Sequence, residues 1–247
     1  MRDIEVEKAY SVMKARDKIN FGEYHKTLLH IHTPASYDYK LYEEWSNEYF
    51  KNLSEDKMIK IAHEKGVLYG EYSSIDVLRD LCTLDGYKNI KEMLSYYILA
   101  YNIYINHVSI VVVTDHNTIS GIEINKMSSK FTNAIYPEVI PGIEISCADK
   151  IHLVAIASID ILNEYFHEKL SGSLLSEKEG TYKTSLDLIN ELNKMGIFNY
   201  IAHINSSNIY TESRFLSGGY KNKLLSSENL KYIGVSNKDK IDKISSF

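Results

Sequence analysis

The stretch VSIVVV-TDHN, residues 108–117, decides the fold. Its first six residues are mostly β-branched and uniformly apolar apart from Ser109, which predicts a buried strand. The strand then gives way, without a spacer, to Thr114-Asp115-His116-Asn117. A carboxylate and an imidazole therefore stand at the tip of a buried strand, where a fold of alternating strands and helices collects its reactive groups.

Similar short apolar runs flank this strand on both sides. We predict strands at 26–33, 139–146, 151–157 and 198–204 from their length and apolar composition. Between them, helices are expected at 54–64, from 73 or 74 onward, at 88–104 and at 185–195, with Gly66 and Gly196 ending the first and last. Strands alternating with helices favour a parallel α/β architecture over a sandwich. The helix-rich stretch at about 39–107 reads as an insertion.

Length and composition describe an ordinary globular chain. The 247 residues are 44% hydrophobic and 25% charged, which suffices for a sizeable core, and an α/β barrel uses about 250. Two cysteines are too few for a disulfide framework, and no run reaches the roughly 18 apolar residues of a membrane span. The amino-terminal residues lack a signal sequence, so we expect a cytoplasmic protein without a membrane partner. A net charge of −5 provides no global attraction for nucleic acid.

Five of the nine histidines fall in or at the end of a predicted strand; they are His30, His32, His116, His152 and His203. Residues two apart on a strand face the same side, so His30 and His32 project together. One histidine in an apolar strand is usually a core residue, but five with acidic companions indicate a metal cluster. Glu144, after the turn Pro141-Gly142, supplies a carboxylate that can bridge two ions. Nitrogen and oxygen ligands without thiolates suit Zn²⁺, Mn²⁺ or Fe²⁺, with Mg²⁺ also acceptable.

These motifs occur in a fixed order: H-x-H-T-x-x-S at 30–36, T-D-H-N at 114–117, P-G-x-E at 141–144, the strand-initial His152, and A-H at 202–203. In that order the chain resembles the polymerase-and-histidinol-phosphatase (PHP) family over about residues 26–205. The resemblance implies a distorted (β/α)7 barrel with two or three divalent ions at its strand ends, hydrolysing phosphoester bonds. It makes residues 26–247 the PHP domain, with 1–25 as an extension before it.

The resemblance also implies a role for each matching residue. His30 and His32 would bind one metal ion, and Glu144 would bridge to a second, completed by His152 and His203. Asp38 and His116 would belong to a third site. Asp115 would orient a ligand. His116 or His203 would assist proton transfer, which makes Asp115, His116 and His203 the candidate catalytic residues.

The chain departs from the PHP pattern at its carboxyl-terminal end. The family's last motif, D-x-H, is absent, and Asn237 and Asp239 do not match it. Because that motif normally supplies one ligand each to the first and third sites, we expect either a barrel incomplete at its C-terminus, in a piece of a longer protein, or a degenerate PHP module. The sequences HIHTPASYDY and AHIN most resemble PHP domains associated with AAA/SMC-like ATPases, which are linked to DNA repair and anti-phage defence.

Three functions follow as alternatives. The first is a metal-dependent nuclease on DNA or RNA that works with an ATPase domain or subunit. The second is a non-catalytic PHP scaffold for an ATPase partner, which the incomplete ligand set favours. The third is a small-molecule phosphomonoesterase of the histidinol-phosphatase type, which would use the same site on another substrate.

Overall fold

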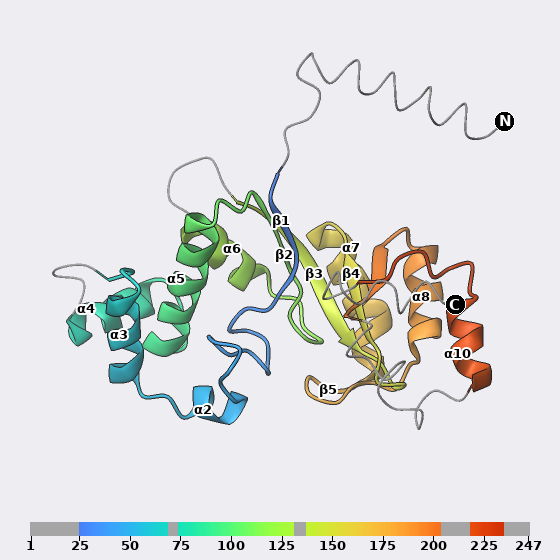
Figure 1. The fold of residues 1–247 in the computed structure, drawn as a ribbon, viewed down its shortest axis with the longest axis horizontal. Coiled ribbons are helices and arrows are strands. Elements are labelled where there is room, and N and C mark those ends of the chain that lie inside the picture. The colour runs from blue at the N-terminus through green and yellow to red at the C-terminus, as the bar shows by residue number, and fades with distance from the viewer. Residues whose placement is uncertain (1–24, 69–73, 131–136, 204–217, 235–247) are drawn as a thin grey trace, which may run out of the picture.

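A curled five-stranded sheet forms the centre of the molecule (Figure 1). The computed structural model describes residues 25–68, 74–130, 137–203 and 218–234. The sheet order is β1-β2-β3-β4-β7. Its strands are β1 (Thr27–Ile31), β2 (Ile110–Val113), β3 (Glu138–Ser146), β4 (His152–Ile156) and β7 (Phe198–Ile201). All five coincide with segments predicted as strands from the apolar runs, with ends that differ by a few residues.

The direction of β4 corrects the expectation of a parallel sheet. β1, β2 and β3 run parallel, but β4 is antiparallel to β3, and β7 is antiparallel to β4. The cause is the short connection 147–151, in which Lys150 adopts a φ of 60°. A turn of this length can close only an antiparallel pair, since a parallel crossover needs about a dozen residues. The sheet is therefore mixed.

The sheet is bent so that its two outer strands approach each other. The Tyr200 hydroxyl of β7 donates a hydrogen bond of 2.9 Å to the Leu29 carbonyl of β1. Ring centroids of His30 and His203 lie 5.6 Å apart, although β1 and β7 are at opposite ends of the strand order. Within the described ranges no ladder joins these strands, so these residues form a mixed α/β fold with a curled half-barrel sheet.

Helices between β1 and β2 form one side of the molecule. They are α2 (Asn47–Lys51), α3 (Glu55–Glu64), α4 (Ile75–Leu84) and α5 (Ile90–Ile105), followed after β2 by α6 (Gly121–Lys130). Ser54 and Ser74 cap α3 and α4 with their hydroxyls, which confirms the two predicted helix starts. The long helix α5 is buried over most of its length, with Tyr96 fully enclosed. This side has its own apolar core, to which β1 and β2 contribute.

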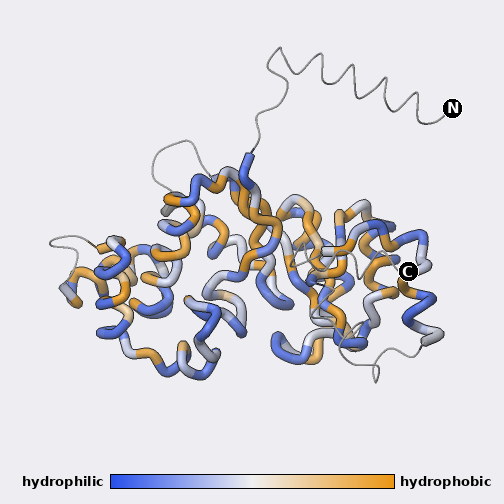
Figure 2. The backbone as a smooth tube through the Cα atoms, viewed as in Figure 1, coloured by the Kyte–Doolittle hydropathy of each residue, from blue (hydrophilic) through white to orange (hydrophobic). Residues whose placement is uncertain are grey.

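A second set of elements covers the other side of the sheet. It comprises α7 (Ile159–Tyr165), the π-helical turn η2 (Phe166–Leu170), the 3₁₀ turn η3 (Ser171–Ser173), the hairpin strands β5 (Leu174–Ser176) and β6 (Gly180–Thr181), α8 (Ser185–Lys194) and α10 (Gly218–Leu225). Thr184 caps α8 at the predicted start. These elements pack on β3, β4 and β7 to form a second core. Figure 2 shows the hydrophobic residues following the central strands between the two sides.

Two predictions fall outside the described residues. Of the expected extension at 1–25, only His25 is among the described residues. Asn237 and Asp239 also lie outside the described residues. In the part of the chain that the structure describes, no helix is both long and apolar enough to cross a membrane.

Candidate metal centre

The sheet brings the predicted metal ligands to one edge. His30 lies near the carboxyl end of β1, and His32 follows that strand. His116 follows β2, and His203 follows β7. His152 begins β4, but because β4 runs in the opposite direction its first residue lies at the same edge, opposite Ser146 of β3. The reversed strand is therefore what allows a strand-initial histidine to join the strand-final ones.

Glu144 of β3 is the centre of the cluster. It has no solvent exposure, and each of its carboxylate oxygens meets two close imidazole nitrogens. Oε2 lies 2.7 Å from His32 Nε2 and 3.2 Å from His30 Nε2. Oε1 lies 2.8 Å from His152 Nδ1 and 3.0 Å from His203 Nε2. A carboxylate with two imidazoles on each oxygen has the form of a bridging ligand.

Asp38 joins the cluster from the loop after β1. Its Oδ1 lies 3.2 Å from His32 Nδ1, and its Oδ2 lies 3.2 Å from His116 Nε2. The Ser36 hydroxyl donates to Oδ1 at 2.7 Å, and the same oxygen of Ser36 accepts the His116 backbone N–H at 3.2 Å. His116 Nε2 is also 3.5 Å from Glu144 Oε2. The carboxylate predicted six residues after His32 is thus placed beside both His32 and His116.

Three sets of side chains place their ligand atoms within 4.8 Å of one another: His30, Glu144 and His203; His32, Asp38 and His116; and His116, Glu144 and His152. The structure brings together every predicted ligand, and the contacts about Glu144 follow the pairing that the resemblance implies, with His30 and His32 on Oε2 and His152 and His203 on Oε1. The three sets overlap, so they do not assign each side chain to one ion. His30 also lies beside His203, because the curl of the sheet brings the end of β7 against β1.

The donor set fits divalent ions. Atoms bound to one ion at about 2.1 Å are roughly 3 Å apart, which matches the nitrogen–oxygen separations around Glu144. Side chains of His30, His152 and His203 are 28%, 32% and 32% exposed, while Glu144 is enclosed beneath them. The cluster is therefore buried on its sheet side and accessible from the other, as a site that keeps positions open for substrate requires.

The close charges perturb the protonation of the cluster. Burial opposes ionisation of Glu144, but the hydrogen bonds from four surrounding histidines outweigh it and hold the pKa of this carboxyl far below its usual range. Burial likewise lowers the pKa of His32, yet hydrogen bonds and Coulombic attraction from Asp38 and Glu144 raise it to about 10. The pKa of Asp38 is held well below normal, because hydrogen bonds from His116, His32 and Ser36 overcome the effect of burial. Without an ion, the site retains protons that an ion would displace.

Asp115 lies behind the cluster and contacts Thr33 rather than the histidines. Its two oxygens accept from the Thr33 backbone N–H at 2.6 Å and the Thr33 hydroxyl at 2.7 Å. The Tyr96 hydroxyl of α5 lies 3.2 Å from that hydroxyl. Burial raises the pKa of Asp115 to about 6 although both Thr33 bonds lower it. Asp115 therefore fixes the backbone immediately after His32, and its carbonyl also accepts the Glu144 backbone N–H at 3.2 Å.

Several supporting residues were not singled out from the sequence. The Thr114 hydroxyl lies 2.9 Å from His30 Nδ1 and so fixes the orientation of that ring. Asn117, at a φ of 53°, pairs with the Ser146 backbone N–H at 2.9 Å and donates to the Glu177 carbonyl at 2.8 Å. Thr114, Asn117 and Ser36 stand inside the motifs H-x-H-T-x-x-S and T-D-H-N, so their place in these motifs could have indicated a supporting role. Ser146 lies outside every quoted motif, and nothing in the sequence indicated its role.

Comparisons with known proteins add one relative and one structural neighbour. No family model matches the chain. An uncharacterized protein of Streptococcus pneumoniae serotype 4 is 36% identical over 228 residues, covering 87% of this chain and 84% of that protein. The crystal structure of the lesion-specific endonuclease PfuEndoQ from Pyrococcus furiosus matches with a TM-score of 0.49 and 13% identity. That match covers 90% of this chain but only 45% of the endonuclease chain.

Proposed function

The chain belongs to the same family as the uncharacterized pneumococcal protein, and we propose that it is a metal-dependent hydrolase that cleaves phosphoesters at the cluster around Glu144. Two features support the proposal together. The ordered PHP-like motifs meet at one edge of a curled α/β sheet, and their side chains supply only nitrogen and oxygen donors. The same arrangement supports assignment to the PHP-type (β/α)7 barrel.

The arrangement around Glu144 carries the proposal. A buried carboxylate in contact with four imidazoles is costly to maintain for stability alone, because charged groups must be desolvated to bury it. An apolar strand such as β3 would be served better by Ile or Val at this position. The cost is explained if the carboxylate bridges cations. Two of the ligand sets share no residue: His30–Glu144–His203 and His32–Asp38–His116. The chain therefore offers ligands for at least two separate ions.

Bound divalent ions would neutralise phosphoryl oxygens and lower the pKa of a coordinated water towards neutrality. The protein's own contribution is placement. Thr114 fixes the His30 ring, Ser36 holds Asp38, and Thr33 with Asp115 fixes the backbone beside His32. These contacts set the directions of ligands that come from separate strands, which is how a supporting shell preserves coordination geometry.

The two histidines expected to assist proton transfer, His116 and His203, both present Nε2 to a carboxylate of the cluster and both belong to the ligand sets. An imidazole nitrogen that binds a metal ion must first lose its proton, so it has none to deliver. In this proposal both side chains therefore act as ligands, and the bound ions would stabilise the leaving oxygen directly.

Covalent catalysis by cysteine is disfavoured. Cys82 and Cys147 are both buried, and burial raises the pKa of the Cys147 thiol well above its usual value. A thiol in this state is neither accessible nor ionised, and the thiolate is the nucleophilic form. Hydrolysis by a metal-activated water needs no such residue.

Among phosphoesters, we favour the phosphodiesters of DNA or RNA. The preference rests on the resemblance of HIHTPASYDY and AHIN to PHP domains associated with AAA/SMC-like ATPases. On the same basis we propose an ATPase domain or subunit as partner, in DNA repair or anti-phage defence. A histidinol-phosphatase type of activity would instead require that small phosphomonoesters be the better substrates.

The test compares hydrolysis by the wild-type chain with that of a His30→Ala/His32→Ala variant. Substrates are a small phosphomonoester, single-stranded DNA and duplex DNA, each assayed with Zn²⁺, Mn²⁺ and Mg²⁺. We expect hydrolysis of DNA by the wild type and loss of activity by at least about a hundredfold in the variant, because two ligands are removed from separate ion-binding sets.

A matched control is the variant His63→Ala/His167→Ala, which removes two exposed histidines far from the cluster in sequence and outside its contacts. It should retain wild-type activity. Full activity in His30→Ala/His32→Ala would refute the proposed function. Faster hydrolysis of the monoester than of either DNA would move the assignment to a small-molecule phosphatase.

A further inference from the structure

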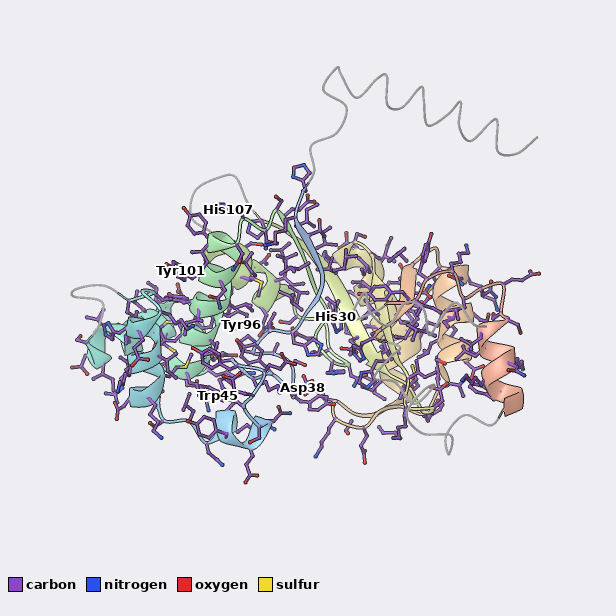
Figure 3. The ribbon with its side chains drawn as sticks, in the orientation of Figure 1. His30, Asp38, Trp45, Tyr96, Tyr101 and His107 are labelled. Atoms are coloured by element: carbon purple, nitrogen blue, oxygen red, sulfur yellow. The ribbon has the colours of Figure 1, made fainter. Side chains whose placement is uncertain are left out.

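A cavity of about 270 Å³ lies between the metal centre and the helices that precede β2. Its walls come from the loop after β1, from α2 and from the start of α5. Ser36, Tyr37, Phe50, Lys51, Lys88 and Lys91 are among its lining residues. We call it the insertion pocket. In Figure 3, Asp38 and Trp45 mark the region between the sheet and the helices on this side.

The insertion pocket shares its wall with the metal centre. Ser36 lines the pocket and also donates to Asp38 Oδ1 at 2.7 Å. Tyr37 lines the pocket, and its ring centroid is 5.2 Å from that of His116. The pocket therefore adjoins the cluster along the loop that carries Ser36 and Tyr37.

The charge in the pocket is positive, against the sign of the whole chain. Lys51, Lys88 and Lys91 line it, with Glu92 as the one acidic residue among its lining side chains. Lys91 Nζ donates to the carbonyls of Lys51 at 2.7 Å and Phe50 at 3.3 Å, which fixes its charge at the pocket wall. Lys88 is 79% exposed and meets Glu92 only at 3.9 Å, so its ammonium remains available to an anion. Lys51 is also exposed.

Aromatic rings accompany these lysines. Tyr37 is half-buried and lines the pocket, while Tyr39 and Phe50 form the buried part of the wall. Trp45 lies against Phe50, with ring centroids 6.4 Å apart, and against Tyr49 at 4.9 Å. Lysines beside aromatic rings are the combination that holds single-stranded nucleic acid, with phosphates on the cations and bases on the rings.

We infer that the insertion pocket binds the nucleotide next to the scissile phosphodiester of a single-stranded nucleic acid, with a backbone phosphate at Lys51 and Lys88 and the base or sugar against Tyr37. The inference deepens the proposed function and rests on it for the position of the scissile phosphate. The volume limits the occupant, because ligand pockets hold roughly 300–1,000 Å³ and this cavity is smaller. One nucleotide unit fits such a space, whereas a base pair does not.

The test measures binding separately from cleavage. Fluorescence anisotropy is recorded with a short labelled oligothymidylate that carries phosphorothioate linkages, which resist hydrolysis, and with the metal-loaded chain. The variant is Lys51→Gln/Lys88→Gln. Its control, Lys57→Gln/Lys60→Gln, removes the same charge from exposed positions of α3 that do not line the pocket. Thermal unfolding and metal content of both variants establish that each retains its fold and its ions.

We expect the pocket variant to bind about tenfold more weakly at low salt, and the control to bind as the wild type does. Removing a lysine that pairs with a phosphate also lowers the slope of log affinity against log salt by about 0.7 for single strands, so the slope should fall by between about 0.7 and 1.4. Tyr37→Ala should weaken binding by a similar factor at all salt concentrations, and Tyr37→Phe should restore it. Equal losses of affinity in the pocket and control variants, or an unchanged salt slope, overturn the inference.

A duplex of the same sequence serves as the second ligand. If it binds as tightly as the single strand and depends on Lys51 and Lys88 to the same degree, the pocket does not select single strands and the inference fails. The outcome for the proposed function is separate: lysine-dependent binding with no cleavage under any metal condition would refute the hydrolase, while cleavage with lysine-independent binding would refute the pocket alone.

Discussion

The bond between Thr33 and Asp115 gives the most specific prediction about how the metal centre is held. Thr33→Val keeps the shape of the side chain and removes only its hydroxyl. That hydroxyl donates to Asp115 Oδ2 at 2.7 Å. Its oxygen also accepts the Ala35 backbone N–H at 3.2 Å and lies 3.2 Å from the Tyr96 hydroxyl. In the wild type, the Asp115 carboxylate accepts from both the hydroxyl and the backbone N–H of Thr33. After the substitution only the bond from the backbone N–H remains of these two.

The expected loss follows from the charge and burial of Asp115. A hydrogen bond to a charged group contributes about 1.5–3 kcal/mol to stability, and Asp115 is only 3% exposed, so water cannot replace the missing donor. We therefore expect Thr33→Val to lower the free energy of unfolding of the metal-free chain by about 1.5–3 kcal/mol at pH 8. Because Thr33 directly follows His32, metal affinity should fall by about tenfold to a hundredfold, as for other residues that orient ligands.

The pH dependence of this loss provides an internal check. Burial raises the pKa of Asp115 to about 6 in the folded chain, above the ordinary value of 3.8. For a carboxyl whose folded pKa is raised, the folded state takes up protons first as pH falls, so the group's unfavourable contribution is present above pH 6 and disappears towards pH 4. Once Asp115 is neutral, the Thr33 hydroxyl makes an ordinary bond worth about 1 kcal/mol. The difference between wild type and variant should therefore shrink as pH falls through about 6.

Urea unfolding of the metal-free proteins between pH 5 and 8 measures the difference. The matched control is Thr83→Val, whose hydroxyl is exposed and bonds the Arg79 carbonyl within α4; it should change stability by less than about 0.5 kcal/mol. An equal cost for the two variants, or a cost for Thr33→Val that grows as pH falls, would contradict the role given to Asp115.

Further predictions concern the ligands and two glycines. Glu144→Gln should lower bound metal by at least one ion per chain and reduce hydrolysis by at least about a hundredfold, while the exposed Glu164→Gln leaves both unchanged; metal analysis of the pair decides this. Metal affinity should rise with pH up to about 10, because the pKa of His32 is raised to about 10 and its proton must leave before an ion binds; calorimetry in buffers of different ionisation enthalpy should detect the released protons, and a flat affinity between pH 6 and 9 would refute it. Gly180→Ala should destabilise the chain by about 3 kcal/mol or more, since its φ is 79° and the added Cβ would overlap the Ser146 carbonyl. Gly196→Ala, at φ 69° with open space around it, should cost about 1 kcal/mol, and equal costs in thermal unfolding would contradict the packing described.

Features encoded by local sequence were predictable. Ser54, Ser74 and Thr184 cap helices at the expected starts, and Gly66 and Gly196 follow their ends at positive φ. The ligands were identifiable because polar residues at the tips of apolar strands have few explanations other than a site. Each ligand is also close in sequence to its own strand, so the strand carries it to the edge.

Features that depend on long-range packing were not predictable. The direction of β4 is an exception, because the short turn between the strands predicted at 139–146 and 151–157 was already enough to require an antiparallel pair. The grouping of His30 with His203 depends on the curl that joins Tyr200 to Leu29. The contact between Asp115 and Thr33 links positions 82 residues apart. Motif order indicates which residues gather, but not which of them share an ion.

The number of metal ions bound per chain tests the central claim most directly. Elemental analysis of the chain, purified without chelators and quantified by amino-acid analysis, gives that number independently of any substrate. At least two divalent ions per chain are expected, because His30–Glu144–His203 and His32–Asp38–His116 are separate ligand sets. Fewer than one ion per chain, even after incubation with Zn²⁺, Mn²⁺ or Fe²⁺, would contradict a metal centre at Glu144.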